Sequence, residues 1–140
     1  MASQLDLRDK LAIQELLGRV AWAYDERRLD VMEDCFSPDI VMTLRVADGP
    51  ENSFTGRDAV LDLNRQALNS QNDQRRHVIS NFFFNEEASD HAQVTSQVVI
   101  FAATADALTP VSSGLYEDQV QREDGAWRIV RRHLKLDRGY

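Results

Sequence analysis

The stretch from Arg75 to Phe84 constrains the fold more than any other, because it reads as one unbroken β-strand. β-Branched and aromatic residues dominate it, and no Gly or Pro interrupts it. Since successive side chains point to opposite faces, one face would carry His77, Ile79, Asn81 and Phe83. The other face would carry Val78, Ser80, Phe82 and Phe84. Both faces are largely apolar, so a histidine and an asparagine lie where polar groups need partners, which predicts the floor of a pocket.

The first half of the chain has the periodicity of helices. Apolar residues recur at three- and four-residue spacing over 7–26, which predicts a helix that Asp6 can cap. A capping box at 30–33 predicts a short second helix that ends before Ser37-Pro38. A strand over 40–46 and a loop over 47–53 follow, and Thr55 is expected to cap a third helix with its buried stripe at 59–67.

The second half of the chain has the pattern of long strands. After the strand that carries His77, further strands are expected at about 92–105, 111–122 and 126–136, the last two joined by a tight turn at Glu123-Asp124-Gly125. Helices followed by an antiparallel meander predict an α+β protein whose helices pack on one face of a curved sheet. With 140 residues, the chain is expected to form one domain, residues 1–140.

Composition narrows the class of function. A hydrophobic content of 43% with 28% charged residues is typical of a soluble globular protein. The net charge of −7 argues against nucleic acid and anionic membrane as partners. The single Cys35 allows no internal disulfide and favours a reducing cytoplasm, and no signal peptide or membrane-spanning run is expected. Three scattered histidines without ligand spacing predict no metal site, and we expect no cofactor.

The end of the first helix is unusual because Asp25 and Glu26 lie where the helix dipole is negative. In one interpretation Arg27 and Arg28 neutralise a solvated helix end. In the other, Asp25 continues the apolar stripe from Leu17 and Ala21, points into the protein and requires a partner. The residues themselves leave both interpretations open.

The order of motifs resembles the SnoaL-like branch of the NTF2-like superfamily. The motifs are Ala12-Ile13-Gln14-Glu15-Leu16, Ala23-Tyr24-Asp25, the strand with His77 and Asn81, and Asp124-Gly125-Ala126-Trp127-Arg128-Ile129. The nearest characterised relatives by this pattern are scytalone dehydratase and hexachlorocyclohexane dehydrochlorinase. The resemblance implies a conical barrel, three helices on a curved, mostly antiparallel sheet, closed over a deep pocket. It also implies that Asp25 pairs with His77.

Such a pair has a definite chemistry. A neutral imidazole can accept a proton from a carbon beside a carbonyl or from a hydroxyl, while a carboxylate on its other nitrogen fixes the tautomer. We therefore expect His77 and Asp25 to be catalytic. The alternative is that His77 is a core histidine without turnover.

The resemblance also assigns the walls of the pocket. Registering the last strand on the dehydrochlorinase makes Arg132 the donor to an oxyanion or substrate carbonyl, although a surface salt bridge is the competing interpretation. Tyr24 matches a tyrosine of the dehydratase. The remaining residues expected to bind substrate are Tyr116, Asn81, Ser96, Val98, Met42 and Ser112. His91 and His133 are expected to be solvated or interfacial.

Departures from both relatives leave the reaction open. No histidine occurs in 93–100, where the dehydratase has its second, and Val20 stands where the dehydrochlorinase has a lysine. The expected function is a cofactor-independent enzyme that abstracts a proton from a hydrophobic, cyclic or polyketide-like small molecule, giving elimination, isomerisation or cyclisation. The alternatives are a non-catalytic binding or assembly domain, and a cyclase or hydrolase in which Asp25 itself is the acid or base.

The strand pattern also predicts self-association. Three helices can cover one face of the sheet, which leaves an apolar set exposed on the other: Val78, Phe82, Phe84, Val99 and Phe101. We therefore expect a homo-oligomer, a trimer slightly ahead of a dimer by resemblance.

Overall fold

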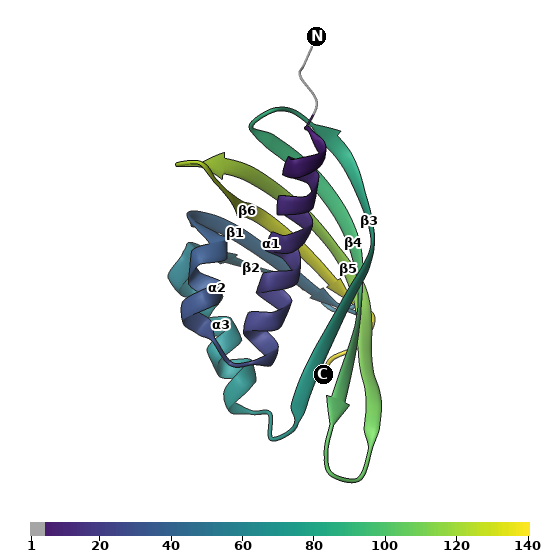
Figure 1. The fold of residues 1–140 in the computed structure, drawn as a ribbon. Helices are drawn as coiled ribbons and strands as arrows, with labels where there is room; N and C mark the ends of the chain where they lie inside the picture. The colour runs from purple at the N-terminus through teal and green to yellow at the C-terminus, as the bar shows by residue number, and fades with distance from the viewer. Residues whose placement is uncertain (1–4) are drawn as a thin grey trace.

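A computed structural model describes residues 5–140 and shows three helices packed on one face of a six-stranded sheet (Figure 1). The elements are, in order, α1 (Leu7–Asp25), α2 (Leu29–Cys35), β1 (Phe36–Val46), β2 (Glu51–Thr55), α3 (Arg57–Asn69), β3 (Gln74–Glu87), β4 (His91–Ala103), β5 (Leu108–Glu123) and β6 (Ala126–Leu136). The expected α+β class, with helices on one face of a curved sheet, is confirmed.

The sheet has the strand order β2-β1-β6-β5-β4-β3. Neighbouring strands are antiparallel, with the exception of β1 and β6, which run parallel. The long strands β3 to β6 form the meander that the second half of the sequence predicts, and they twist behind α1 in Figure 1. The hydrophobic core lies between this sheet and the three helices, so the side chains on the inner face of the sheet meet those of α1.

Three local predictions about helix and strand ends are wrong. Arg28, which has no side-chain capping bond, precedes α2, and its guanidinium holds Asp30 in the first turn instead of leaving that carboxylate to cap. Gly56, with φ +92°, precedes α3 in place of the expected cap Thr55. The loop expected at 47–53 contains the start of β2, which pairs with β1 from Val41 to Arg45. The cap at Asp6 is confirmed, since its Oδ1 accepts from the N–H of Asp9 at 2.8 Å.

A β-bulge in β3 reverses the expected faces of its second half. The pairing with β4 shifts register between Ser80 and Phe83, and Asn81 adopts φ +56°. Because the extra residue exchanges inside and outside, Phe82 and Phe84 pack against the core, whereas Phe83 is 55% exposed. The predictions that Phe83 faces the pocket and that Phe82 and Phe84 face away from it are therefore wrong.

The same bulge removes Asn81 from the pocket. Its side chain is exposed and its Nδ2 donates to Oε1 of Gln97 on the neighbouring strand. The prediction that Asn81 faces the pocket and binds substrate is wrong for this reason. A bulge cannot be seen in strict alternation, because alternation assumes that every residue has a partner on the next strand.

A second irregularity decides the faces of β6. The pairing of β5 with β6 shifts register between Gln119 and Val120, opposite Val130. Trp127 and Ile129 are therefore buried on the same side as Arg132 and Leu134. Strict alternation would have put these two pairs on opposite faces. The shift is what allows the last strand to bury both its aromatic start and Arg132.

Candidate active site

Asp25 and His77 form a buried pair where the end of α1 meets β3. The ring Nδ1 of His77 lies 2.6 Å from Oδ1 of Asp25, and the backbone N–H of His77 donates to Oδ2 at 2.8 Å. Their side chains are only 6% and 3% exposed. Gln74 Nε2 donates to the backbone carbonyl of Asp25 at 2.8 Å, which ties the helix end to the strand. The interpretation that Asp25 points inward to a partner is confirmed.

The arginines after Asp25 do not screen it. Arg27, with φ +58°, donates to the carbonyls of Leu68 and Gln71 at 2.9 and 2.7 Å and so fastens the end of α1 to the end of α3. Arg28 pairs with Asp30. The carboxylate of Asp25 is left to His77, and because it can only accept, the proton of the neutral imidazole lies on Nδ1. The lone pair of Nε2 then points away from Asp25.

Nε2 faces a small, partly enclosed cavity of about 40 Å³ between α1 and the sheet. The cavity is lined by Leu17, Val20, Ala21, Tyr24, Met32, Phe36, Met42, Asn64, His77, Ile79, Tyr116, Arg132, Leu134 and Tyr140. Most of these side chains are apolar, so fixed charges and dipoles inside act more strongly than they would in water. Of the residues predicted from the sequence, this cavity is lined by His77, Tyr24, Met42, Tyr116 and Arg132, and Asp25 lies behind the ring of His77.

Arg132 enters the cavity as half of a buried ion pair. Its Nε and Nη2 donate to Oδ1 and Oδ2 of Asp118 at 2.7 and 3.2 Å, and its guanidinium lies 4.1 Å from the ring centre of Tyr116. The expectation that Arg132 points inward agrees with this geometry. Among residues 5–140, its Nη1 has no hydrogen-bond partner, so the two N–H groups of Nη1 remain for a ligand in the cavity.

The phenols around the cavity are neutral at ordinary pH. Burial raises the pKa of Tyr116 to about 12, with Arg132 acting in the opposite direction. Burial also raises the pKa of Tyr24, whose hydroxyl accepts from Gln71 Nε2 at 2.9 Å. Oε1 of Gln71 is buried and finds no partner among the described residues. The cavity therefore offers hydroxyl groups that donate hydrogen bonds rather than phenolates.

Three further predicted residues are buried but do not line this cavity. Ser96 and Val98 lie on the inner face of β4, deeper in the core, and the hydroxyl of Ser96 has no partner among residues 5–140. Ser112 is occupied elsewhere, since its Oγ donates to the carbonyl of Arg138 at 2.5 Å.

Sequence reasoning missed two residues of the site. Asp118 lies between Tyr116 and Val120 on the same face of one strand, so alternation alone could have indicated an inward carboxylate. Tyr140 follows the last strand, and no local pattern brings it to His77. Its hydroxyl nevertheless lies 3.3 Å from Nε2 of His77.

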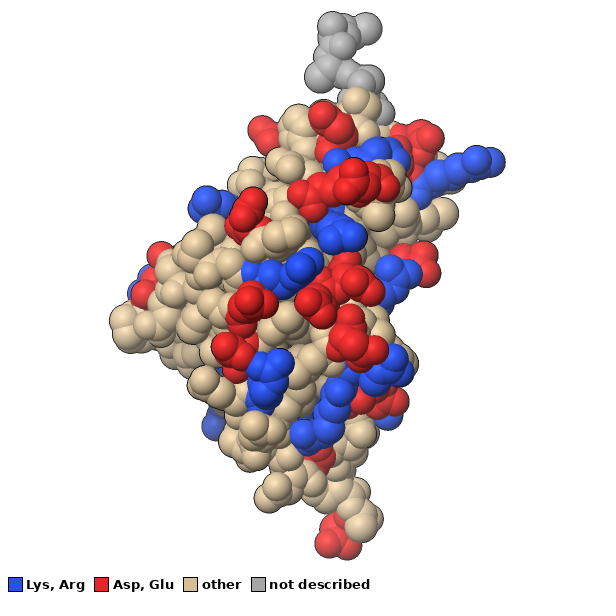
Figure 2. Space-filling model, turned by 90° about the vertical axis from the view of Figure 1, so that its left-hand side faces the viewer, with Lys and Arg blue, Asp and Glu red and all other residues tan. Residues whose placement is uncertain are grey.

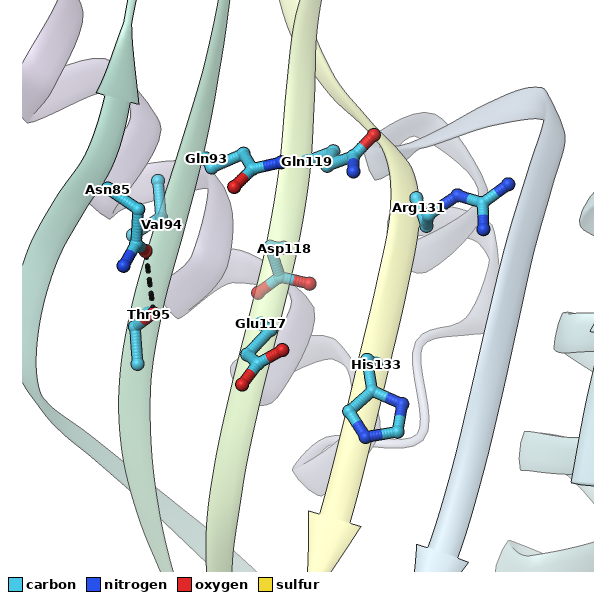
Figure 3. A pocket seen from close by; sticks show the side chains of 9 residues that line it. All are labelled: Asn85, Gln93, Val94, Thr95, Glu117, Asp118, Gln119, Arg131 and His133. Carbon is cyan, nitrogen blue, oxygen red and sulfur yellow. Dashed lines mark hydrogen bonds between the residues drawn. The ribbon is translucent and has the colours of Figure 1, made fainter. Parts of the chain in front are cut away.

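A second, wider hollow of about 270 Å³ lies on the outer face of the sheet, away from the dyad. Figure 3 shows Glu117 and Gln119 of β5 beside Arg131 and His133 of β6, with Asp118 turned the other way. His133 is tied down, because its Nδ1 lies 2.5 Å from Oγ1 of Thr43. His91 is exposed beside Asp90. We take the smaller cavity as the candidate active site, because it alone of the two is lined by the paired imidazole.

The surface charge, the metal-ligating side chains and the helix lengths indicate no further site in the described part of the chain. Basic and acidic side chains are interspersed over the face shown in Figure 2. Within residues 5–140, His, Cys, Asp and Glu form no group of three or more able to hold a metal ion. No helix in the described part of the chain combines the length and the apolar character needed to cross a membrane.

The curved sheet, the three helices over it and the cavity between them define an NTF2-like α+β protein. The profile of the SnoaL-like domain matches residues 5–133, and the chain belongs to this family. It is 28% identical over 136 residues to the uncharacterised protein Rv2910c of Mycobacterium tuberculosis, covering 94% of this chain and 88% of that protein.

Solved structures agree on the fold. A Novosphingobium aromaticivorans protein provisionally named scytalone dehydratase is 22% identical, with a TM-score of 0.76 over 93% of this chain and 85% of its own. LinA is 20% identical, with a TM-score of 0.77 over 94% of this chain and 87% of its own. The resemblance inferred from the motif order is thereby confirmed at the level of family and fold.

Proposed function

We propose that this protein is a cofactor-independent enzyme in which Nε2 of His77 abstracts a proton from a hydrophobic, cyclic or polyketide-like small molecule. The observation that carries this proposal is the buried hydrogen-bonded pair of Asp25 and His77 at the wall of a largely apolar, partly enclosed cavity. A non-catalytic binding or assembly domain has no need for an imidazole whose tautomer is fixed by a carboxylate and whose second nitrogen faces a largely apolar cavity. The fold similarity to a protein named as a dehydratase is consistent with the proposal.

The remaining polar groups have roles in the same reaction. When Nε2 removes a proton beside a carbonyl, the electron pair moves onto the carbonyl oxygen, and Nη1 of Arg132 is the donor available to that oxygen. The imidazolium is stabilised by Asp25 and returns the proton to a departing hydroxyl in an elimination, or to a second carbon in an isomerisation. Tyr24, Tyr116 and Met42 form walls around the substrate.

The geometry disfavours Asp25 itself as acid or base. Both of its carboxylate oxygens are engaged by His77, one by the ring and one by the backbone N–H. A proton transfer to substrate would have to break one of these buried bonds first. Nε2 is the group that a ligand in the cavity would meet, and we assign the base to it.

The proposed reaction can be tested without knowing the leaving group. Exchange of carbon-bound hydrogen beside a carbonyl can be followed by NMR in D2O for a panel of cyclic ketones and hydroxyketones. We expect His77→Ala to abolish exchange, because general bases contribute about 10²-fold or more. Asp25→Asn should nearly abolish it, because the amide favours the wrong tautomer.

The matched control is His91→Ala, which removes an exposed histidine far from the cavity and should exchange substrate at the wild-type rate. Circular dichroism should show that all three variants are folded. Retention by His77→Ala of more than about a tenth of the wild-type rate would exclude it as general base.

We also propose that the protein forms a homo-oligomer in the reducing cytoplasm. Val78 and Val99 are 50% and 38% exposed on the outer face of the sheet, as expected. The hollow on the outer face of the sheet carries both Glu117 and Arg131, so two copies of this face can offer each other opposite charges. Cys35 is buried and free, which is consistent with a reducing compartment.

A further inference from the structure

The segment after β6 returns to the helical layer and ends at the cavity. Figure 1 shows it passing from the end of the sheet toward the lower end of α1. Its path is fixed by hydrogen bonds to β5: the N–H of Asp137 donates to the carbonyl of Ser113 at 2.8 Å, and Ser113 Oγ donates to Oδ2 of Asp137 at 2.6 Å. Ser112 Oγ holds the carbonyl of Arg138 at 2.5 Å.

The side chain of Tyr140 occupies the space in front of the catalytic base. Its hydroxyl lies 3.3 Å from Nε2 of His77, and since Nδ1 carries the imidazole proton, the phenol donates and Nε2 accepts. The ring packs edge-on against His77 and Tyr24, with centroids 5.7 and 6.4 Å away. The guanidinium of Arg75 lies 5.3 Å from its centre. Burial raises the pKa of the Tyr140 phenol well above its usual value, which keeps it a donor.

Little room remains beside this ring. The cavity of about 40 Å³ contrasts with the roughly 300–1,000 Å³ of pockets that hold ligands of drug size. A cyclic molecule cannot enter while Tyr140 stays where it is, and a substrate proton cannot reach Nε2 while the phenol is bonded to it. The groups in contact with Tyr140 are those that a substrate would need: a base for its hydroxyl or acidic carbon, two aromatic edges and a cation over its ring.

We propose that Tyr140 is a self-ligand, an aryl hydroxyl that holds the place of the substrate on His77 until the substrate displaces residues 137–140. The site accordingly takes a planar ring that bears a hydroxyl, a phenol or a cyclic enol, with that hydroxyl on Nε2. This inference rests on the proposed function, because it takes the displacing molecule to be the substrate. The binding of such a ring does not itself require turnover.

The direct test is to remove the self-ligand and supply its missing atoms as free phenol. Tyr140→Ala removes the hydroxyphenyl group and retains Cβ, so the vacated space has the shape of phenol. Cavities made in this way bind the matching aromatic molecule, and we expect calorimetry to show phenol bound at least about tenfold more tightly than by the wild type. Phenol should bind about three- to tenfold more tightly than benzene, because only phenol donates to Nε2.

Two control variants sharpen the result. Leu108→Ala shortens an exposed side chain on the hairpin between β4 and β5 and should bind phenol no better than the wild type. Tyr140→Phe retains the ring and removes the hydroxyl, so it should leave the cavity filled while shifting the ¹⁵N resonance of Nε2 of His77. This second measurement needs no cavity and remains decisive if Tyr140→Ala does not fold.

The outcomes separate cleanly. Equal phenol binding by Tyr140→Ala and the wild type, or equal binding of phenol and benzene, would overturn the proposal, and so would an unchanged Nε2 resonance in Tyr140→Phe. Phenol binding by Tyr140→Ala together with full exchange activity in His77→Ala would preserve the self-ligand and overturn the proposed function. Loss of exchange activity in His77→Ala, together with no gain in phenol binding by Tyr140→Ala, would preserve the proposed function and overturn the self-ligand.

Discussion

At the scale of single residues, charges in the interior are matched in pairs. Asp25 serves His77, and Asp118 serves Arg132, whose side chains are 0% and 7% exposed. The second pair leaves Nη1 of Arg132 to donate into the cavity, while the carboxylate of Asp118 offsets most of the guanidinium charge. This arrangement suits a neutral carbonyl or hydroxyl compound better than a carboxylate, because a free buried cation would be needed to hold an anion.

Asp118→Asn should be strongly destabilising, because it leaves the Arg132 guanidinium buried without its counter-charge. We expect the free energy of unfolding to fall by about 3–5 kcal/mol, measured by urea denaturation. Asp62→Asn, which breaks an exposed pair with Arg65 on α3, is the control and should leave the midpoint unchanged. A wild-type midpoint for Asp118→Asn would show that the pair contributes nothing to stability.

At the scale of elements, the bulges in β3 and β6 determine which side chains of these strands face the core and the cavity. The bulge at Asn81 leaves His77 and Ile79 facing inward while turning Phe82 and Phe84 inward as well. The irregularity opposite Val130 lets β6 bury Ile129 and Arg132 on one side. Without these extra residues Phe83 would face the core in place of Phe82 and Phe84, and Ile129 would lie on the opposite face from Arg132.

The bulge predicts a substitution pattern at position 81. A β-branched residue is disfavoured at φ +56°, so Asn81→Val should destabilise the protein by about 1–2 kcal/mol in urea, whereas Asn81→Gly should change stability little. Ser80→Val places the same side chain at a neighbouring exposed position of the strand and should not destabilise. Equal stability of Asn81→Val and Asn81→Gly would contradict the assigned backbone conformation.

At the scale of the whole molecule, the helical layer covers one face of the sheet and leaves the other open. If the open face joins two or more copies, light scattering should give a multiple of the 16.0 kDa chain mass at micromolar concentration. Val99→Glu should reduce this mass to that of the monomer. Leu11→Glu, on the exposed side of α1, should leave it unchanged. A monomeric wild type would refute the assembly.

The burial of tyrosines in the core also makes the free energy of unfolding depend on pH in the alkaline range. Burial raises the pKa of all three tyrosines, that of Tyr116 from 10.0 to about 12. The unfolded chain therefore binds fewer protons than the folded one above pH 10, and stability falls as pH rises through that range. Ultraviolet titration should show tyrosinate forming above pH 10 in the native protein, together with a falling urea midpoint. Tyrosinate formation centred on pH 10 with an unchanged midpoint would contradict the burial.

Local patterns were sufficient for the elements and for part of the site. Apolar periodicity predicted α1, alternation predicted the four long strands, and the order of the motifs indicated the family and the pairing of Asp25 with His77. These features depend on side chains a few residues apart, or on a sequence order that related proteins share. The stripe of its own helix allowed the inward direction of Asp25 as one of two interpretations, and the resemblance favoured it.

The rest depends on contacts between distant segments. Register shifts form where two strands must match in length and curvature, so the exposed Asn81 and the buried Phe84 could not be read from β3 alone. Asp118 can be buried because it pairs with Arg132 on the next strand. Tyr140 reaches His77 only because hydrogen bonds to β5 hold the segment that follows β6. The packing of the sheet against α1 therefore decides which side chains meet at the cavity. The physical reason is that a buried polar group needs a partner, and the partner comes from a distant segment of the chain.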